Sequence, residues 1–411
     1  MTGVQPPPGR RSPLAALAVR DYRYFMVAQV TGNCGMWMHR TAHVWLVVQL
    51  SGADGLAVGV VTSLQYLSMI VLSVGGGSLG DRFDKRRLML VTQVASVLAC
   101  LALALLIFRG LVTLPIAYVF AVLLGIPNAI DAPVRLAYPR QLVPREVLAP
   151  AVGLNGAVFQ FARVVGPALA GGVLALLGTG QAFLVVAALG AVSCTALLGI
   201  RPPVRGNRVE RGRVAGWRRT LRELRNPAYL VPLFGGLVLG IGMTNLQLVL
   251  PLLVHSSDSA ARSFGVYLAM IGAGGVVGSA LTSVVVSVPR NRHLHLWSAV
   301  FAAVTIVVAL LPSGVWLAVA LFVAGAVMQA FGTTAISALQ LRGSADLQSK
   351  LMALYVIVFF VWAPLGAPLF GGLADLLGAR SALTASGVLC LVLIGLSVVV
   401  LRRGRGPASS L

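Results

Sequence analysis

The sequence predicts an all-α polytopic membrane protein in which twelve transmembrane helices form two parallel-repeat six-helix bundles. Hydrophobic residues make up 58% of the 411 residues and charged residues only 10%, whereas a soluble domain carries roughly 25% charged residues. The mean hydropathy is +0.90. The apolar residues gather in continuous runs of about 20, a length that crosses a bilayer as a helix. Strands of a membrane barrel alternate in polarity instead, so these runs exclude a β-barrel.

The apolar runs define the predicted helices in chain order. Several contain Gly or Pro, which membrane helices tolerate because neighbouring helices satisfy the freed backbone groups. The first run is too long for a cleavable signal peptide, so we expect the 20 residues before it to be a basic tail. The predicted spans are 24–50, 56–79, 88–108, 112–131, 150–177, 181–200, 229–254, 265–287, 296–312, 314–337, 352–377 and 381–401.

The distribution of Lys and Arg predicts the orientation of these spans. With the N-terminus inside, the inner segments hold 27 of the 32 cations, Arg135 among them, and the outer loops hold 3. Such a bias is typical of cytoplasmic loops, and it explains the net charge of +21 without a nucleic-acid partner. We therefore expect a multi-pass protein of the cell (inner) membrane with both termini cytoplasmic. Its predicted parts are a tail at 1–20, a six-helix bundle at 21–200, a basic loop at 201–227, a second bundle at 228–402 and a tail at 403–411.

An internal repeat supports the division into two halves. A shift of 200 residues aligns the fifth span with the eleventh, with seven identities in thirteen positions. Gly is common in apolar helices, so chance similarity is the alternative explanation. Two parallel six-helix halves are one way in which secondary transporters are built, with the substrate site between them. The paired residues are Gly166, Leu169, Gly171, Gly172, Leu176, Leu177 and Gly178 with Gly366, Leu369, Gly371, Gly372, Leu376, Leu377 and Gly378.

The turn between the second and third spans carries a charged motif. Its two glycines permit close helix approach, and Asp81 faces cations four and five residues further on. The alternative is that the cations only enforce topology, but topology requires neither the Asp nor the glycines. The motif consists of Gly77, Gly80, Asp81, Arg82, Lys85 and Arg86.

This turn resembles the signature loop of the major facilitator superfamily, which reads Gly-x-Leu-Ala-Asp-Arg-x-Gly-Arg/Lys-Arg. Two positions depart from it, because Gly80 replaces the usual Ala and Asp84 the usual Gly. The resemblance extends over essentially all 411 residues and implies the fold of that superfamily. It also implies that Asp131 completes a charge relay with the motif. The charged cluster formed in this way is expected to join the two halves on the inner side. Such a contact favours an outward-open state.

Two further stretches resemble the enterobactin-exporter and macrolide-exporter branch of the superfamily. They are Trp37-Met38-His39-Arg40-Thr41-Ala42 before Trp45-Leu46-Val47, and Leu142-Val143-Pro144-Arg145-Glu146 before Ala162-Arg163-Val164-Val165-Gly166-Pro167-Ala168-Leu169-Ala170-Gly171. Gly166, Pro167 and Gly171 also resemble the motif of drug/proton antiporters, which implies a helix bend that serves as a bearing for rocking. A passively packed small-residue helix is the alternative.

Polar residues inside the spans are the candidates for a substrate cavity. Asn33, Trp37 and Arg40 share one face of the first span, although Arg40 could instead extend toward the outer interface. For Arg163, a structural bond to Asp131 or to free carbonyls competes with ligand contact. For the other polar residues, helix-to-helix hydrogen bonds compete with a place in the cavity. The candidate cavity residues are Asn33, Trp37, Arg40, Gln65, Gln160, Arg163, Asn245, Gln247 and Gln329.

None of the 11 acidic residues falls in the middle of a span, which restricts the means of proton coupling. The remaining candidates are Asp131 near the inner face, which we prefer, and His39 or His43, because imidazole titrates near neutral pH. Transport driven only by a substrate gradient is the alternative. Arginines without central carboxylates also favour neutral or anionic cargo over cations.

The motifs that the sequence lacks exclude most other function classes. There is no Walker segment, no HExxH and no GxSxG, so we expect no enzyme activity, catalytic residue, cofactor or metal. We expect a secondary active transporter that exports a small amphipathic molecule, such as a drug, macrolide or siderophore, by alternating access. The expected partners are that substrate, the proton and the lipid bilayer, and we expect it to function as a monomer. The alternatives are an importer of a nutrient or anionic metabolite and a non-transporting membrane sensor.

Overall fold

The computed structural model describes residues 15–82, 84–201, 226–255, 260–285, 290–341 and 345–403. Within these ranges, side chains are described except at 69–82, 145, 149, 160, 227, 283–285, 345–350, 353, 356 and 401–403. All regular elements in the described ranges are helices. The predicted loop at 201–227 and the two predicted tails therefore lie mostly outside the described residues.

Among residues 15–82 and 84–201, the first half of the chain forms six long helices and three short ones. The long helices are α1 (Arg20–Ser51), α2 (Gly55–Arg82), α3 (Lys85–Phe108), α4 (Leu114–Ala137), α6 (Leu148–Leu176) and α7 (Thr179–Leu198). The short ones are α5 (Pro139–Leu142) and the 3-10 helices Ala15–Ala18 and Arg145–Val147. Each predicted span before residue 201 falls on one of the long helices.

The described residues of the second half form seven helices. They are α9 (Pro227–Val254), α10 (Ala260–Val285), α11 (Asn291–Leu310), α12 (Val315–Gln340), α13 (Ala345–Phe360), α14 (Ala363–Leu377) and α15 (Ala379–Arg403). The predicted span 352–377 is thus two helices rather than one. The interruption comes just before Pro364, at the start of α14, where proline fits because the first turn of a helix has no partner for its missing N–H.

Most of these helices have the length and composition of membrane spans. Ten helices in the described part of the chain are long and apolar enough to cross a membrane, and Gly55–Ser68 is a shorter apolar segment. Large apolar side chains such as Leu98 and Leu105 on α3 and Leu396 on α15 are exposed on the outside of the bundle, as expected where helices face lipid.

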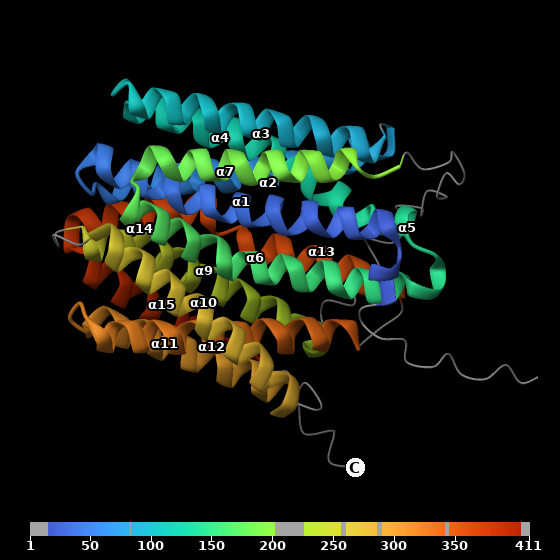
Figure 1. Ribbon diagram of the computed structural model, residues 1–411. Helices are drawn as coiled ribbons and strands as arrows, with labels where there is room; N and C mark the ends of the chain where they lie inside the picture. The colour runs from blue at the N-terminus through green and yellow to red at the C-terminus, as the bar shows by residue number, and fades with distance from the viewer. Residues whose placement is uncertain are drawn as a thin grey trace, which may run out of the picture.

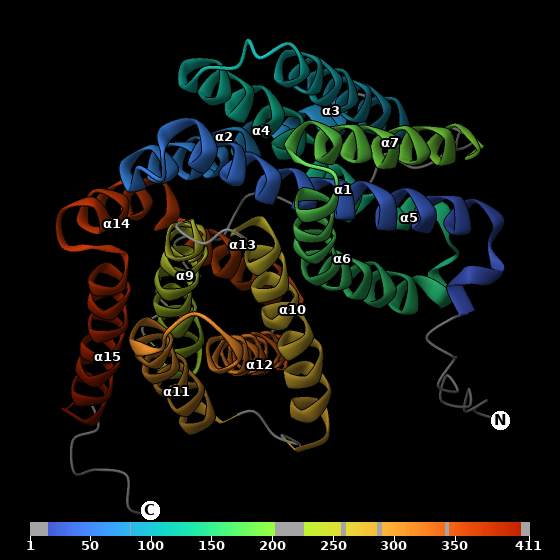
Figure 2. The ribbon, with the colours of Figure 1, turned by 60° about the vertical axis from the view of Figure 1, so that its left-hand side comes forward.

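The helices pack in two groups that follow the chain order (Figures 1 and 2). In the first group α1 lies against α6 and α7, α2 against α4, and α3 against α7. In the second group α10 packs on α12, α11 on α15, and α9 on both α13 and α15. We call these the N-terminal and C-terminal groups.

The most extensive contacts between the two groups join α2 to α14 and α6 to α10. These contacts lie at the end of the bundle that holds the connection of α1 to α2 and that of α14 to α15. We call this end of the bundle the closed end. A Cβ added to Gly55 would lie 2.5 Å from the carbonyl oxygen of Gly371, and one added to Gly171 would overlap the backbone of Gly265. Only glycine permits such backbone contact. The sequence motif implied that the halves join at the opposite end, which we call the terminal end.

Candidate functional site

A cavity lies between the two helix groups. Its empty volume, open solvent included, is about 590 Å³. Helices α1, α2 and α6 form one wall, and α9 and α10 form the other. The lining residues are Trp37, Arg40, Thr41, Val44, Thr62, Gln65, Tyr66, Pro167, Thr244, Gln247, Leu248, Phe264 and Leu268.

Arg40 is part of the wall of this cavity. Its Cζ lies 4.9 Å from the ring centroid of Tyr66 and 5.3 Å from that of Trp37, distances at which a cation is attracted to an aromatic face. Only 8% of the residue is exposed. The guanidinium is therefore buried between aromatic rings and does not extend to a membrane interface.

Aromatic pairs link the two groups around the cavity. Trp45 on α1 stacks on Phe264 on α10, with ring centroids 5.1 Å apart and planes 17° apart. Because Phe264 also lines the cavity, this pair covers it beside the glycine contact of α6 and α10. Tyr66 on α2 stacks on Phe360 on α13 with a centroid distance of 5.4 Å.

Arg163 on α6 lies one helical turn before Pro167, and its partners belong to the C-terminal group. Its Nη2 is 3.5 Å from the Sδ of Met243 and 3.6 Å from the Sδ of Met328. Its Cζ lies 6.0 Å from the ring centroid of Phe359. The guanidinium thus crosses from one helix group to α9, α12 and α13 of the other. The partner considered from the sequence, Asp131, is engaged elsewhere.

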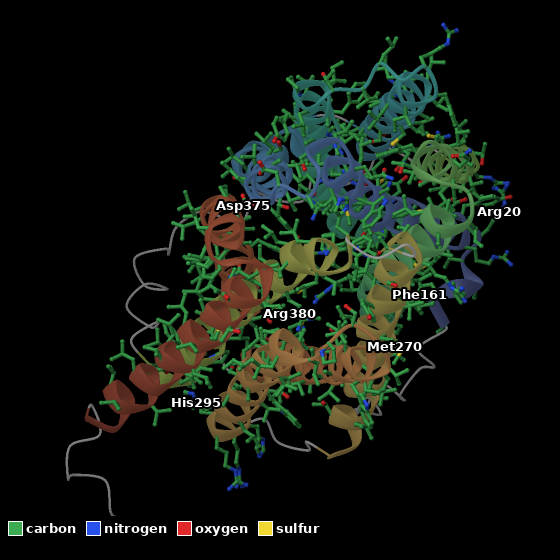
Figure 3. All side chains as sticks on the ribbon, turned by 90° about the vertical axis from the view of Figure 1, so that its left-hand side faces the viewer. Arg20, Phe161, Met270, His295, Asp375 and Arg380 are labelled. Carbon is green, nitrogen blue, oxygen red and sulfur yellow. The ribbon has the colours of Figure 1, made fainter. Side chains whose placement is uncertain are left out.

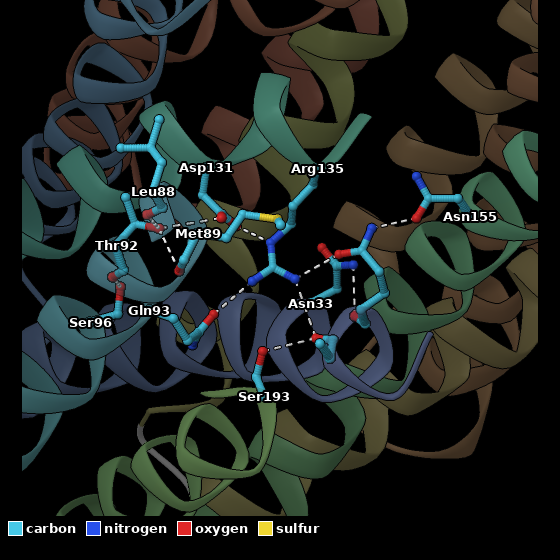
Figure 4. A network of polar contacts seen from close by, with 12 residues as sticks. Asn33, Leu88, Met89, Thr92, Gln93, Ser96, Asp131, Arg135, Asn155 and Ser193 are labelled. Carbon is cyan, nitrogen blue, oxygen red and sulfur yellow. Dashed lines mark hydrogen bonds and ion pairs between the residues drawn. The ribbon is translucent and has the colours of Figure 1, made fainter. Parts of the chain in front are cut away.

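Asp131 and Arg135 form a buried ion pair on α4 (Figure 4). Arg135 Nε donates to Asp131, and the Thr92 hydroxyl lies 3.3 Å from the same carboxylate. The two Nη atoms of Arg135 donate to the side-chain oxygens of Gln29 at 2.6 Å and Gln93 at 2.8 Å. These contacts bring α1, α3 and α4 together through one guanidinium.

The amide of Gln29 extends the network to α6 by donating to the side chain of Asn155. We call these six residues, Gln29, Thr92, Gln93, Asp131, Arg135 and Asn155, the Asp131–Arg135 network. The sequence placed Arg135 in an inner segment after the span 112–131, whereas α4 continues past Pro133 to Ala137 and includes Arg135. An Asp and an Arg four residues apart were the available signal, since that spacing places them on one helix face.

Four of the nine predicted cavity residues line the cavity, namely Trp37, Arg40, Gln65 and Gln247, whereas Arg163 is not among the lining residues. The Asn245 amide instead donates to the Ser386 hydroxyl at 2.9 Å, inside the C-terminal group. Asn33 donates to the carbonyl of Gln29 on its own helix at 2.8 Å. Gln329 is half-buried on α12 beside Gly275 of α10. The side chain of Gln160 lies outside the described residues.

The two predicted coupling histidines are buried on α1. His43 Nε2 lies 2.9 Å from the carbonyl oxygen of Ala117 on α4. A carbonyl only accepts, so this nitrogen must carry the proton. The His43 ring also meets the edge of Phe183 on α7 with centroids 6.0 Å apart, and His43 therefore ties three helices together. His39 is 4% exposed.

The charged motif is described in part. Gly77, Gly80, Asp81 and Arg82 lie on α2, with side chains outside the described residues. Lys85 begins α3. Arg86 donates to the carbonyls of Leu197 at 2.8 Å and Leu198 at 2.7 Å; cations at the last carbonyls of a helix are favourable. Asp84, which departs from the signature, accepts from the Arg87 amide at 2.8 Å and caps α3.

The residues of the predicted bend serve close packing. A Cβ on Gly166 would lie 2.6 Å from the Cβ of Trp37, so α6 approaches α1 closely there, and Gly171 meets Gly265. Pro167 lines the cavity inside α6, which is one helix from Leu148 to Leu176. The bearing function of these residues remains a prediction.

A contact that the sequence did not predict connects the groups at the closed end. Asp375, near the end of α14, lies beside α2 (Figure 3). Its Oδ1 accepts from the Gly55 amide at 2.7 Å and its Oδ2 from the Leu56 amide at 2.8 Å. Asp54 accepts from the Ala57 amide at 2.7 Å. Two carboxylates from different helix groups thus satisfy the first amides of α2, where free N–H groups and the helix dipole favour negative charge.

Comparison with known proteins gives relatives of one kind. The chain is 26% identical over 163 residues to the staphyloferrin A transporter of Staphylococcus aureus, covering 39% of this chain and 41% of that protein. It is 33% identical over 160 residues to a putative sugar efflux transporter of Deinococcus radiodurans, covering 38% and 40%. An uncharacterised MFS-type transporter of Sinorhizobium fredii is 26% identical over 320 residues, covering 74% and 75%.

Solved structures of transporters share the fold. The nucleoside transporter NupG aligns with a TM-score of 0.68 at 11% identity, covering 92% of this chain and 98% of that one. A bacterial homologue of the lysosomal transporter Spinster aligns with a TM-score of 0.68 at 15% identity, covering 92% and 95%. The profile of the MFS_3 family, described as transmembrane secretion effector, matches residues 11–406. The chain therefore belongs to this family of the major facilitator superfamily and is a membrane transporter, not an enzyme.

Proposed function

We propose that the protein is a secondary active exporter of small amphipathic molecules, such as a drug, macrolide or siderophore, and that it works by alternating access. The observation that carries the proposal is the cavity between the two helix groups, which both groups line and which is covered at the closed end. A transporter of this design needs a central site that opens to one side at a time. Relatives named for a siderophore and for sugar efflux support a small-molecule cargo and export.

The protein lies in the cell membrane with the terminal end in the cytoplasm. The excess of Lys and Arg in the segments at that end supports this orientation. The closed end then faces the outside of the cell. Because the two helix groups are in contact at that end, the state described is inward-open. A cargo enters the cavity from the cytoplasm and leaves after the halves separate at the closed end.

Proton antiport supplies the driving force, and Asp131 is the carrier we favour. Its carboxylate is shared by Arg135 and Thr92 at the junction of helices in the N-terminal group. Protonation of Asp131 weakens its pairing with Arg135, whose other contacts reach α1 and α3. A proton on one carboxylate therefore alters contacts among three helices, which is what coupling requires.

Inverted vesicles with an imposed pH gradient test this function. We expect wild-type vesicles to accumulate at least one of a macrolide, an aromatic drug and a siderophore, and to lose accumulation when the gradient is collapsed. Asp131→Asn should abolish gradient-driven accumulation but retain exchange of preloaded compound. Asp84→Asn, which alters a capping carboxylate outside the network, is the matched control.

Two outcomes would contradict parts of the proposal. Unchanged gradient-driven accumulation in Asp131→Asn would exclude this residue as the carrier. Uptake only into right-side-out vesicles would favour the importer that the sequence also permits. The double variant Asp131→Asn/Arg135→Gln controls for the unpaired cation that the single change leaves.

A further inference from the structure

Arg163 has unusually weak hydrogen-bond partners for a guanidinium that lies between two helix groups. A guanidinium offers five N–H donors, whereas a thioether sulfur is a weak acceptor. The acceptors that the structure gives to Nη2 are the sulfur atoms of Met243 and Met328, at 3.5 and 3.6 Å. An oxyanion would replace these contacts with stronger, charge-assisted bonds.

The acidic side chains that the structure describes lie away from the cavity. Asp54 and Asp375 hold the first amides of α2, Asp84 caps α3, and Asp131 is paired with Arg135. The other two are Asp21, beside Arg20, and the exposed Glu146. The thirteen residues that line the cavity include Arg40 and no Asp or Glu. The charged residue among these lining residues is therefore a cation.

A row of aromatic rings connects the two arginines. Arg40 lies over Tyr66, Tyr66 stacks on Phe360, and the Phe360 centroid is 5.0 Å from that of Phe359. Phe359 in turn carries Arg163 over its ring. A ligand beside this row meets an apolar aromatic surface with a cation at each end.

We propose that an amphipathic anion binds between the two helix groups, with its apolar body in the cavity and along the aromatic row that leads from the cavity wall to Arg163, and with a carboxylate or another oxyanion at Arg163. Arg40 is the second cation, and the aromatic row and Trp37 accept the apolar body. This assignment rests on the proposed function, because it names the cargo class of that cavity. Neutral and cationic analogues bind less tightly, because the N–H donors of Arg163 then keep the weak sulfur acceptors of Met243 and Met328.

Equilibrium binding to the purified full-length protein tests the assignment without a proton gradient. Isothermal titration calorimetry in detergent compares three probes with the same ring system, namely 2-naphthylacetate, 2-naphthylacetamide and 2-(2-naphthyl)ethylammonium, each corrected for uptake by empty micelles. We expect the carboxylate to bind about tenfold more tightly than the amide, the ratio that about 1.4 kcal/mol of charge-assisted bonding gives. The ammonium should bind most weakly.

Variants of Arg163 provide the decisive comparison. Arg163→Met should remove the preference for the carboxylate while the fold is retained, because its side chain packs beside Met243 and Met328 as another apolar residue. Arg163→Lys should keep part of the preference, and Arg40→Gln should weaken carboxylate binding several-fold. Arg109→Gln, an exposed arginine at the closed end, should bind all three probes as wild type does.

Several results would overturn the assignment. These are absence of carboxylate binding, equal or tighter binding of the amide or the ammonium, and a preference that persists in Arg163→Met. Displacement of the carboxylate by phosphatidylglycerol added to the micelles would assign the site to a lipid headgroup instead of a soluble cargo. A retained anion preference together with failed gradient-driven accumulation would contradict only the proposed antiport.

Discussion

At the scale of single residues, the buried Asp131–Arg135 pair is the charged feature whose loss should be most costly. Its members have relative side-chain exposures of 14% and 7%, and the guanidinium has partners on two further helices. Removing one member of a buried ion pair leaves an uncompensated charge and costs about 3–5 kcal/mol, whereas replacing both members costs far less. The packing of α4 against its neighbours therefore depends on Asp131 and Arg135 being charged, or being replaced, together.

A double-variant cycle measures this dependence. We expect Asp131→Asn and Arg135→Gln each to lower the midpoint of thermal unfolding in detergent. The double variant should unfold at a temperature above that predicted by adding the two losses, since neither charge then remains unpaired. Favourable coupling of roughly 0.5–3 kcal/mol is typical of residues in one network. Strictly additive losses would show that the pair does not act as a unit.

Which polar residues reach the cavity could be predicted only in part. Gln247 lines it, but Asn245, two positions earlier on α9, points into the C-terminal group and bonds Ser386. Residues two apart on a helix lie on different faces. The sequence contains no direct signal for how α9 is rotated about its axis, because it is apolar on nearly all sides and largely buried.

At the scale of elements, the contact of Asp375 with the start of α2 couples the two helix groups. Carboxylate caps of helix amides contribute about 0.5–2 kcal/mol, and this cap comes from the opposite group. We expect this contact to break when the two helix groups separate at the closed end. In the proposed alternating-access cycle its energy then contributes to the equilibrium between the two states as well as to helix stability.

Asp375→Asn should shift that equilibrium toward opening of the closed end, by about 5–30-fold for a loss of 1–2 kcal/mol. The measurement is the rate at which a membrane-impermeant thiol reagent, added on the closed-end side, labels Thr62→Cys in a background without the four native cysteines. Asp54→Asn is the matched control, because Asp54 caps α2 from within its own group. Equal acceleration by both variants would show that helix fraying causes the effect.

The helices themselves could be predicted well, because a long apolar run indicates a span directly. The break between α13 and α14 was missed because residues 361–362 do not interrupt the apolar run. Pro364 was the available signal, since proline favours the first turn of a new helix over the interior of a continuing one. Asp375 was also missed as a connection, because its partners are backbone amides 320 and 319 residues away.

At the scale of the whole molecule, the two groups meet through α2 with α14 and α6 with α10, around a cavity. The family and the fold were predictable because the hydropathy pattern extends over the whole chain and the motif identifies the turn between the second and third spans. The end at which the halves meet was not. The motif implied contact at the terminal end, whereas the structure has extensive contact at the closed end. In the proposed alternating-access cycle the two ends close in turn, so one sequence encodes both states.

Paired distance measurements between the groups test alternating access most directly. Spin labels at Leu111 and Val315, both exposed at the closed end, report one opening, and labels at Arg140 and Arg290 report the other. Double electron–electron resonance in lipid nanodiscs should give a short closed-end distance and a long terminal-end distance in the state described. Acidic pH or a bound cargo should lengthen the first and shorten the second together. If both distances stay fixed, or both lengthen at once, the two groups do not expose the cavity alternately and the account is contradicted.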